Sequence, residues 1–445
     1  MDNLSPKIVA FLCTWCSYAG ADLAGTGRNQ YPSNIRVVRV PCSGRINPLY
    51  IIKALLEGAD GVMVSGCHPG DCHYLVGNYH ARRRFVVLKR LLTAAGFEPD
   101  RVHFTWVSAS EGARFADVVK EVTGKVNALD LSIKPEIKSE HQLSALKQPE
   151  KPIECQPERS DKSLQQQELI SLCRRLLEDG AVSSIIGFQN GGETGLSIPC
   201  IIDSPEEIDK LVWNDRCVPN LSGYLFDRAG KTAIIAKPCD ARAVVCLIKE
   251  NQLKRDDMYI IGLACDGMVG DDGKLLPACF CCEVRIPPVY DVLVGELCTE
   301  RNDHEHGITG QARNDEQQKN YDESIERFVS EMNKCILCYS CRQTCYGCYC
   351  ETCFIERGET DWQPSSPDIG TKMLYHLGRT THLSGRCVEC GACENACASR
   401  VNIRYLIQAV TRFIEDEYDY KSGMDSETEP AMLTYNVDDR EIGFL

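Results

Sequence analysis

Residues 61–72 read GVMVSGCHPGDC, an apolar run that ends in a tight turn containing two cysteines. The run predicts a buried strand over Gly61–Ser65, because short apolar segments bounded by Gly and Pro are typical of parallel sheets. Three similar runs predict further strands: Ile8–Leu12, Ile35–Val40 and Val102–Val107. Amphipathic stretches between them predict helices: Leu49–Leu56, Tyr79–Ala95 and Ala113–Val126. This alternation predicts a parallel α/β sandwich in the first module.

Five cysteines stand at or just beyond the carboxyl ends of three of these strands: Cys13, Cys16, Cys42, Cys67 and Cys72. Ligands bind at that edge of open α/β sheets, so we expect the thiols to converge on one metal centre. Four thiolates suffice for an iron–sulfur cluster, and the fifth is then a neighbour. His68 and His73 flank the last turn, where they either bond to cluster sulfurs or, as turn histidines commonly do, to the backbone.

Cysteine is the outlying residue of the composition, with 27 among 445 residues. A disulfide framework is not expected, because the chain is long, the count is odd and residues 1–12 do not read as a secretory signal. The sequence lacks a run of 18 apolar residues, so a membrane span is not expected either. We therefore expect a cytoplasmic protein whose cysteines bind zinc or iron–sulfur clusters.

The charge of the chain is acidic and uneven. The formal net charge is -14, which argues against nucleic-acid binding because phosphate contacts need excess positive charge. Residues 1–128 carry +5 and the remainder carries -19, a polarity that suits docking between two different partners. The acidic residues after Ile414 predict a tail that is solvated or drapes over a partner. Arg82, Arg83 and Arg84 predict either a docking site for an acidic partner or a solvated helix face.

The most specific motif is a doubled cysteine run near the end of the chain. Residues 334–354 read KCILCYSCRQTCYGCYCETCF and residues 385–400 read GRCVECGACENACASR. Each contains the C-x2-C-x2-C-x3-C spacing of bacterial ferredoxins, in which the fourth cysteine reaches the other 4Fe–4S cluster. Zinc sites typically offer two C-x2-C pairs instead. The predicted ligands are Cys335, Cys338, Cys341, Cys345, Cys387, Cys390, Cys393 and Cys397.

Helices are expected around these runs, over Ile369–Leu383 and Asn402–Ile414, which fits a mostly helical dicluster ferredoxin. Three additional cysteines follow the first run: Cys348, Cys350 and Cys353. They either complete a fourth 4Fe–4S cluster with another module or remain free thiols.

The middle of the chain predicts a second α/β module. The segment TAIIAKPCDARAVVCLIKEN reads as a strand, a tight turn at Lys237–Cys239 and a helix with Asp240 as its N-cap. The free N–H groups at that helix start favour an anion, either a thiolate-ligated cluster or a flavin phosphate. The candidate cofactor-binding residues are Lys237, Asp240 and Arg242, and an ordinary surface role is the alternative for Lys237 and Arg242. Cys279 and Cys282 form a C-x-x-C pair, with Cys281 as an alternative ligand.

These motifs carry family resemblances. Residues 7–128, with FLCTWCSYAGADLAG, RVPCSGR and GADGVMVSGCHPGDCHYLVGN, resemble the delta subunit of methyl-viologen-reducing hydrogenase. That resemblance implies one 2Fe–2S cluster at the five strand-end cysteines and electron transfer to the flavoprotein subunit of heterodisulfide reductase. The last module resembles the ferredoxin-like subunits of heterodisulfide-reductase-type complexes.

The middle module resembles, more loosely, the beta-subunit family of deazaflavin-reducing hydrogenases and formate dehydrogenases. The resemblance implies a 4Fe–4S cluster held by Cys239, Cys265, Cys279 and Cys282, and often FAD. In this chain KPCDA stands where those proteins usually have a Gly-Thr-Pro-Cys-Gln turn, so FAD binding stays an open alternative.

The sequence therefore predicts an α/β multidomain chain. We expect a 2Fe–2S domain over 1–128, a linker over 129–165, an α/β domain over 166–321, a dicluster ferredoxin over 322–415 and an acidic tail over 416–445. The hypothesis is an electron-transfer protein that connects a heterodisulfide-reductase-like flavoprotein with a dehydrogenase or hydrogenase partner, within a hetero-oligomeric, electron-bifurcating complex of anaerobic metabolism.

Two alternatives stay open. The first is an FAD-containing oxidoreductase component that oxidises NADH, formate equivalents or a deazaflavin, although the sequence has no G-x-G-x-x-G fingerprint after a predicted strand. The second is a zinc-bound regulatory scaffold. The sequence offers no evident nucleophile–base pair or carboxylate dyad, so we expect no catalytic residue in this chain itself.

Overall fold

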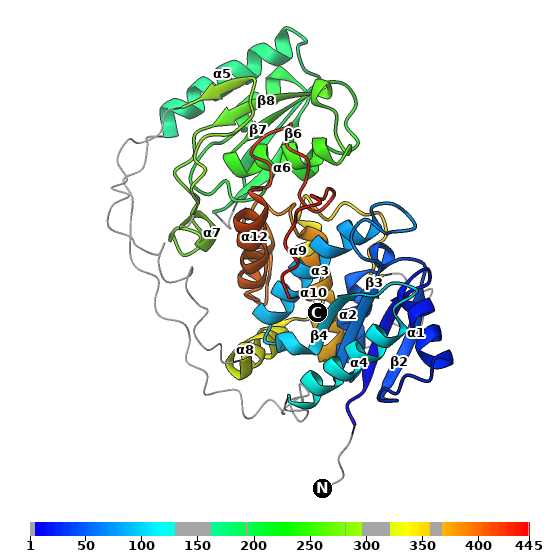
Figure 1. Ribbon diagram of the computed structural model, residues 1–445. Helices are drawn as coiled ribbons and strands as arrows, with labels where there is room; N and C mark the ends of the chain where they lie inside the picture. The colour runs from blue at the N-terminus through cyan, green and yellow to red at the C-terminus, as the bar shows by residue number, and fades with distance from the viewer. Residues whose placement is uncertain are drawn as a thin grey trace, which may run out of the picture.

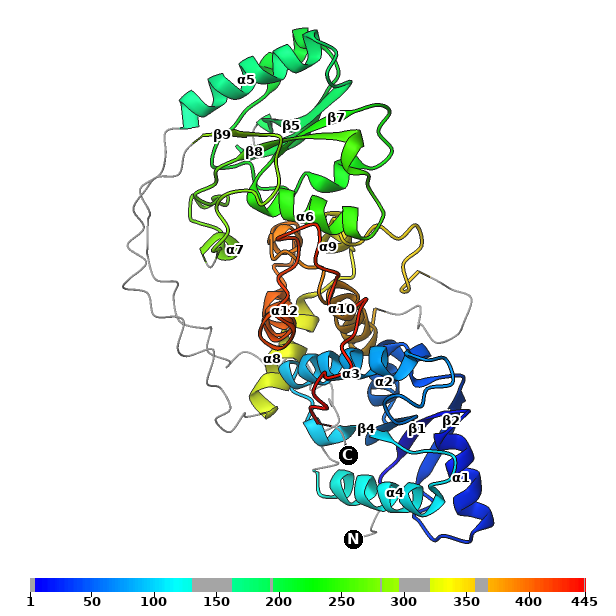
Figure 2. The same cartoon turned by 45° about the horizontal axis from the view of Figure 1, so that its top comes forward.

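The computed structural model describes residues 5–129, 162–192, 195–280, 282–295, 321–356, 367–443 and 445. Two sheets with their helices flank a group of C-terminal helices, which confirms the expected α/β multidomain class (Figure 1). The order of the modules in space differs from their order in the sequence, since the C-terminal helices lie between the middle and N-terminal sheets (Figure 2). Residues 130–161 of the expected linker lie outside the described residues.

The N-terminal module is a parallel four-stranded sheet with strand order β2-β1-β3-β4. Its strands are β1 (Ile8–Cys13), β2 (Ile35–Val40), β3 (Gly61–Gly66) and β4 (Val102–Trp106). Its helices are α1 (Ser17–Thr26), α2 (Pro48–Leu56), α3 (Gly77–Ala94) and α4 (Gly112–Asn127). The four strands and three of the helices were predicted; α1 was missed because its sequence, SYAGADLAGT, has no clear apolar stripe.

Helices cover both faces of this sheet, as the continuous apolar strands require. Ile8 and Leu12 of β1 belong to a core shared with α1 and α4, whereas Phe11 of the same strand belongs to a core shared with α2 and α3. The alternation follows from the two-residue period of side chains along a strand. Strands β1, β3 and β4 are buried almost throughout, whereas most residues of the edge strand β2 are exposed. The sheet positions the loops that follow its strands.

The C-terminal module consists of helices α8 (Tyr321–Lys334), α9 (Ser340–Gln343), α10 (Ile369–Leu383), α11 (Ala392–Asn395) and α12 (Arg404–Tyr418). Helix α10 has the predicted bounds, and α12 extends beyond its predicted end. Asp368 starts α10, because its carboxylate accepts a 2.8 Å hydrogen bond from the Thr371 N–H group.

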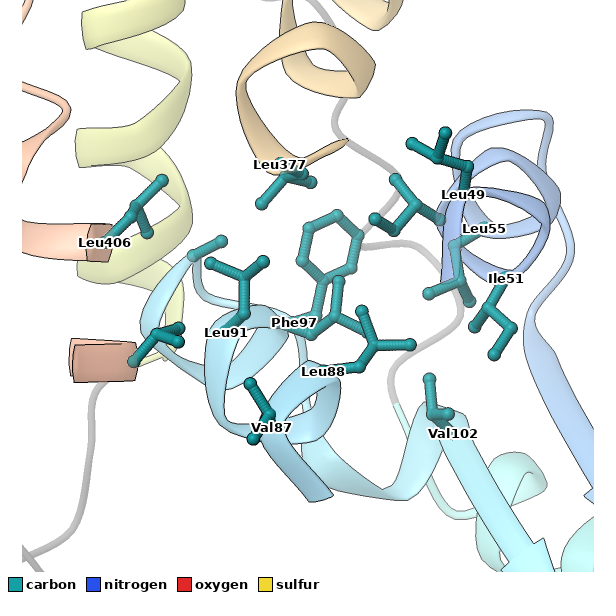
Figure 3. Close-up of a cluster of buried hydrophobic side chains, with 14 of the residues drawn as sticks. Leu49, Ile51, Leu55, Val87, Leu88, Leu91, Phe97, Val102, Leu377 and Leu406 are labelled. Carbon is teal, nitrogen blue, oxygen red and sulfur yellow. The ribbon is translucent and has the colours of Figure 1, made fainter. Parts of the chain in front are cut away.

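The N-terminal and C-terminal modules share one hydrophobic core. Leu49 and Leu91, from α2 and α3, lie in the same buried cluster as Leu377 of α10 and Leu406 of α12 (Figure 3). The approach is close, since a Cβ on Gly378 would lie only 2.4 Å from Leu49 Cδ2. Full burial of each such side chain adds about 1.5–3 kcal/mol to the free energy of unfolding. We infer that these two modules form one structural unit.

The middle module is a mixed five-stranded sheet with strand order β6-β5-β7-β8-β9, in which only β6 is antiparallel to its neighbour. Its strands are β5 (Ser184–Asn190), β6 (Ser197–Ile202), β7 (Thr232–Ala236), β8 (Met258–Leu263) and β9 (Val292–Val294). Its helices are α5 (Lys162–Glu178), α6 (Pro238–Lys249) and α7 (Pro277–Phe280). Helix α5 begins inside the range expected to be linker, and Gln165 there accepts a 2.9 Å hydrogen bond from Trp213 Nε1.

Short 3-10 helices complete the described chain: η1 (Ser43–Arg45), η2 (Pro99–Arg101), η5 (Pro205–Lys210), η6 (Ser222–Leu225) and η7 (Arg255–Asp257). Among the described residues, none of the helices is both long enough and apolar enough to traverse a lipid bilayer.

The middle module contacts the C-terminal module through α6. Arg242 is buried and donates hydrogen bonds to the carbonyls of Ser422 (3.0 Å) and Val388 (3.3 Å). Glu250, just after α6, pairs with Arg386, and Leu247 packs against Tyr346 in a small apolar cluster. Arg242 was expected to contact a cluster or phosphate, with a surface role as the alternative. Its guanidinium instead joins two modules through these carbonyls, so the surface role is wrong and the cofactor contact stays a prediction.

The acidic tail folds back on the N-terminal module, which corrects two expectations. Arg83 makes a two-point ion pair with Asp439, with Nε–Oδ2 at 2.5 Å and Nη2–Oδ1 at 3.0 Å. Arg82 donates to the carbonyls of Asn436 and Val437, at 2.6 and 3.0 Å. These arginines are buried by the chain's own tail, so neither a solvated helix face nor a solvated tail describes this region. The third arginine, Arg84, donates to the carbonyl of Gly44.

Candidate metal centres

The cysteines at the N-terminal sheet edge converge as predicted, and we call them set N: Cys13, Cys16, Cys42, Cys67 and Cys72. All five are buried. The sulfurs of Cys13, Cys16 and Cys67 lie within 4.8 Å of one another. The Cys13–Cys67 and Cys42–Cys72 sulfur distances are 3.9 and 3.7 Å, too long for the roughly 2.05 Å bond of a disulfide. Unbonded buried thiols gathered in this way fit the ligand set of a metal centre.

Close backbone packing shapes the pocket around set N. A Cβ on Gly77 would lie 2.6 Å from Cys42 Sγ and 3.3 Å from Cys72 Sγ, and one on Gly44 would collide with the Gly77 backbone. Asn78 is buried beside this contact and donates to the carbonyls of Cys67 (3.2 Å) and His68 (2.6 Å). Glycine at these positions therefore lets the start of α3 approach the sulfurs, and Asn78 fixes the cysteine turn.

The thiols of set N share protons unequally. The pKa of Cys13 is lowered, first by its hydrogen bond with Cys16 and then by that with Cys42. The same bond is the main reason that the pKa of Cys16 rises to about 12. Within this group the thiolate form is favoured at Cys13 and disfavoured at Cys16.

The two histidines of this region point away from the sulfurs. His68 Nε2 lies 2.7 Å from Glu111 Oε2, and the same oxygen accepts a 2.7 Å hydrogen bond from the Ser108 N–H group. His73 stacks on the half-exposed Trp15 ring, with centroids 3.8 Å apart. In the described part of the chain neither imidazole bonds to a cysteine or to the backbone, so both contacts are with other side chains and differ from the two expected roles.

The middle module brings its four predicted cysteines to one cavity, and we call them set M: Cys239, Cys265, Cys279 and Cys282. The cavity encloses about 500 Å³ including the part open to solvent, and Lys237 and Asp266 also line it. Cys239 lies in the first turn of α6 and Cys265 follows β8, so both stand at the carboxyl edge of the sheet. Burial raises the pKa of Cys265 to about 11.

The turn before α6 differs from the prediction in its details. Pro238 occupies the first helical position, so Lys237 is the N-cap and Asp240 is the third residue of the helix. The buried Asp240 carboxylate accepts hydrogen bonds from the N–H groups of Lys237 (2.9 Å) and Leu221 (2.8 Å). Lys237 Nζ lies 2.9 Å from both this carboxylate and the Pro219 carbonyl. Both charges are thus satisfied internally, and Lys237 is buried rather than a surface residue.

The two C-terminal cysteine runs adopt the same backbone conformation. The second residue after the first cysteine has positive φ in each run, Leu337 (53°) and Glu389 (57°), and the residue after the second cysteine does too, Tyr339 (60°) and Gly391 (72°). The N–H groups of Leu337 and Glu389 each donate to the sulfur two residues before, at 3.4 Å. The repeat in the sequence is therefore a repeat in the structure, with backbone donors directed at the sulfurs.

The runs exchange their fourth cysteines, as the ferredoxin spacing predicts. Set A comprises Cys335, Cys338, Cys341 and Cys397, which together line one cavity of about 410 Å³ including its open part. Set B comprises Cys387, Cys390, Cys393 and Cys345, and the charge of Cys345 acts on the other three. Burial raises the pKa of Cys390 to about 12. Four gathered thiols with backbone donors fit a cluster of bound iron better than four free thiols.

Helix α10 contributes three polar side chains whose role was not predicted from the sequence. Tyr375 Oη lies 3.3 Å from Cys341 Sγ, and His376 Nε2 lies 3.3 Å from Cys335 Sγ. Arg379, one turn further on, donates to the Cys341 carbonyl at 3.0 Å. Burial lowers the pKa of His376 to about 3, so this imidazole is neutral. The sequence pattern that could have predicted this role is three polar residues at positions i, i+1 and i+4 of a helix that lies between the two cysteine runs.

Sets B and M lie next to each other. Cys390 of set B also lines the cavity of set M, and a Cβ on Gly391 would lie 2.6 Å from the Ala278 Cβ of helix α7. This contact between modules was not predicted from the sequence, because neither motif specifies which surface it faces.

The three additional cysteines do not gather. Cys348 is a close neighbour of Cys345, and their hydrogen bond lowers the pKa of Cys345. Cys350 is exposed, and the charge of Cys353 acts on Tyr339 and Arg342. Among the described residues only Cys13, Cys16 and Cys67 of set N lie within 4.8 Å of one another, so this distance does not separate the three additional thiols from sets M, A and B. The three additional cysteines line neither of the two cavities described above. Cys281 lies outside the described residues.

Comparison with known proteins identifies the first module. Residues 8–130 match the family model described as methyl-viologen-reducing hydrogenase, delta subunit. The vhc iron–sulfur protein of the F420-non-reducing hydrogenase of Methanococcus voltae is 53% identical over 128 residues, which are 29% of this chain and 89% of that protein. The chain belongs to the methyl-viologen-reducing hydrogenase delta-subunit family. The resemblance seen in residues 7–128 is thereby confirmed, and the resemblances of the middle and last modules stay predictions.

Two further relatives match stretches of this chain of similar length. The iron–sulfur protein of the F420-non-reducing hydrogenase of Archaeoglobus profundus is 54% identical over 128 residues, 29% of this chain and 93% of that protein. A component of the ferredoxin:CoB-CoM heterodisulfide reductase of Methanosarcina mazei is 46% identical over 143 residues, 32% of this chain but only 18% of that protein. Set N lies inside the matched family segment, and sets M, A and B lie outside it.

Proposed function

We propose that this chain is an iron–sulfur electron-transfer protein, with a 2Fe–2S cluster at set N and 4Fe–4S clusters at sets M, A and B. Such clusters supply one-electron transfer, which protein side chains alone do not perform. The observation that carries the proposal is the adjacency of the thiol sets. Cys390 of set B lines the set M cavity, and Cys345 of set B comes from the run that supplies set A.

The arrangement of the modules supports a relay across the molecule. Set A lies beside the core shared with the N-terminal module, since Cys335 belongs to that core together with Leu49 of α2. The sets therefore follow the order M, B, A and N through the molecule, although the chain order is N, M, A and B. With the sets in this spatial order, electrons enter and leave at opposite ends of the relay, set M and set N.

The names of the relatives support a proposal about the partners. The printed names of the relatives are those of components of hydrogenases and of a heterodisulfide reductase. We propose that electrons pass between a dehydrogenase or hydrogenase partner at the set M end and a heterodisulfide-reductase-like flavoprotein at the set N end, in a cytoplasmic, flavin-based bifurcating complex. The reducing cytoplasm is where free thiols in this number persist.

Anaerobic purification of the full chain tests this proposal, with iron, acid-labile sulfide, zinc and flavin quantified on one sample. We expect about 14 iron atoms per chain, with matching sulfide, from one 2Fe–2S and three 4Fe–4S clusters. Stoichiometric FAD alongside the iron would instead support a flavin-dependent oxidoreductase. Zinc without sulfide, or about two iron atoms or fewer, would overturn the electron-transfer role.

A further inference from the structure

Three large apolar side chains are exposed on the two loops that follow β1 and β3 and carry cysteines of set N. Trp15 lies in the first loop, and Tyr74 and Leu75 lie in the second. Their exposed fractions are 50%, 51% and 78%. Single exposed apolar residues are normal on a protein surface, but a group of them marks an interaction site. We call these three residues patch N.

Contacts within the two loops hold patch N in place. The Trp15 ring stacks on that of His73, with centroids 3.8 Å apart, and its Nε1 donates a 3.4 Å hydrogen bond to Tyr74 Oη. Leu75 has a φ of 68°, which side chains of its kind rarely adopt, and its N–H group donates to the Cys72 carbonyl at 2.8 Å. Such strain gathers at functional sites, and an ordered surface loses little conformational entropy on binding.

The chain itself covers other parts of the N-terminal module. The C-terminal helices pack against α2 and α3 in one shared core. At the edge strand β4, the Leu445 N–H group donates to the Phe104 carbonyl at 2.9 Å, and Trp106 Nε1 donates to Glu441 at 2.8 Å. Electron transfer slows steeply with distance, so a partner of set N must come close to its cysteine loops. Patch N is the exposed apolar surface on those loops.

The charges beside patch N favour an acidic partner. Arg39 is exposed at the end of β2, and its Nε donates a 3.1 Å hydrogen bond to Oγ1 of Thr14, the residue before Trp15. Arg45 is exposed in η1, and Asp71 is the exposed carboxylate of the cysteine turn. In a two-fold dimer the same patch of each copy would meet, which brings like charges together. A partner with carboxylates around an apolar contact therefore fits better than a second copy.

We propose that patch N is the docking surface for an acidic flavoprotein that exchanges electrons with set N. This inference rests on the proposed function. Each transfer moves one electron between set N and the flavin of the partner, and no bond in this chain forms or breaks. The apolar side chains of patch N pack against the partner, while Arg39 and Arg45 pair with its carboxylates and accelerate the encounter.

Stopped-flow kinetics of the full chain, purified and reduced without oxygen, test this inference. The oxidant is either flavodoxin, an acidic protein that carries FMN, or free FMN. Leu75→Asn removes the apolar contact but suits the left-handed backbone. We expect this variant to react about tenfold more slowly with flavodoxin and at the wild-type rate with free FMN. Leu164→Asn, which replaces an exposed leucine of α5 in the middle module, is the matched control and changes neither rate.

A second variant tests the charges. Arg39→Gln should slow the reaction with flavodoxin at low salt and have little effect at high salt, because salt screens exposed charges. A wild-type flavodoxin rate in Leu75→Asn, or an equal loss of rate with flavodoxin and free FMN, would overturn the assignment. A wild-type dimer that dissociates in Leu75→Asn, seen by sedimentation, would overturn it too, since a second copy would then occupy the patch. Failure of the proposed function is distinct, because the wild-type chain would lack iron and sulfide.

Discussion

Set N and set A differ in the chain segments that supply their cysteines. Set N draws on three separate segments that only the parallel sheet brings together, and three of its sulfurs lie within 4.8 Å of one another. Set A draws mostly on one short loop, and the surrounding helices α9 and α11 have only four residues each. The sheet thus exists before the thiols meet, whereas the loops of sets A and B have little structure of their own. We infer that metal binding follows folding at set N and accompanies it in the C-terminal module.

Removal of iron should therefore affect the two regions very differently, and this is the largest effect we expect. After anaerobic chelation, backbone amides of α9, α11 and the cysteine loops should lose most of their protection, because these segments contain only four-residue helices and no strand. Amides of β1 and β3 should stay protected, because helices cover both faces of that sheet. Hydrogen exchange measured by mass spectrometry reports both regions at once. Equal loss of protection in the sheet would contradict the distinction.

Replacement of a single ligand sharpens the comparison. Cys42→Ser should abolish the 2Fe–2S signal and remove about two iron atoms per chain, while the 4Fe–4S signals persist. Electron delivery to the flavoprotein should fail for the same reason. Cys200→Ser is the control, since this cysteine of β6 lies in no thiol set. Persistence of the 2Fe–2S signal together with loss of 4Fe–4S signals would show that the clusters are wrongly assigned.

Gly77→Ala should produce a smaller, local defect at set N. The added methyl group would lie 2.6 Å from Cys42 Sγ, so the start of α3 must move and the sulfurs with it. We expect lower occupancy of the 2Fe–2S cluster with unchanged 4Fe–4S content, measured by iron analysis and spectroscopy. Gly124→Ala in α4 meets nothing within 4 Å and should instead stabilise the fold by about 0.5–1 kcal/mol. Wild-type cluster content in Gly77→Ala would argue against this close packing.

Loss of the contact between the tail and the N-terminal module should have the smallest effect on cluster content. Asp439→Asn removes the charge that pairs with Arg83, so residues 431–443 should become sensitive to proteases while iron content is retained. Burial raises the pKa of Asp439, but the hydrogen bond from Arg83 outweighs it and leaves the pKa lowered. The contact is therefore fully present above the ordinary Asp pKa of about 3.9 and is lost as the pH falls through the lowered value. Protease resistance equal to wild type would contradict this docking.

The sequence predicted local features better than contacts between modules. The runs that became β1 to β4, the convergence of set N and the exchange of fourth cysteines all follow from short patterns with a fixed geometry. Asp240 was misplaced as an N-cap because Pro238 is the first helical residue, which moves the N-cap three residues earlier, to Lys237. Arg379 was missed because an arginine in an amphipathic helix ordinarily faces solvent.

The order of the modules could not be read from the sequence for a physical reason. Leu49 and Leu377 each mark an apolar helix face, but apolar faces are not directional and do not specify their partners. The same holds for the tail, whose acidic composition predicts solvation until its specific bonds to Arg82 and Arg83 are seen. Contacts of this kind depend on complementary surfaces that are far apart in the chain.

Mössbauer spectroscopy of the full chain, purified anaerobically from cells grown on isotopically enriched iron, tests the central claim most directly. It counts iron by cluster type in one sample. We predict that about one-seventh of the iron is in a 2Fe–2S cluster and the remainder in 4Fe–4S clusters, with the first fraction absent in Cys42→Ser. A spectrum with a single cluster type, or a chain whose cysteines hold zinc, would contradict it.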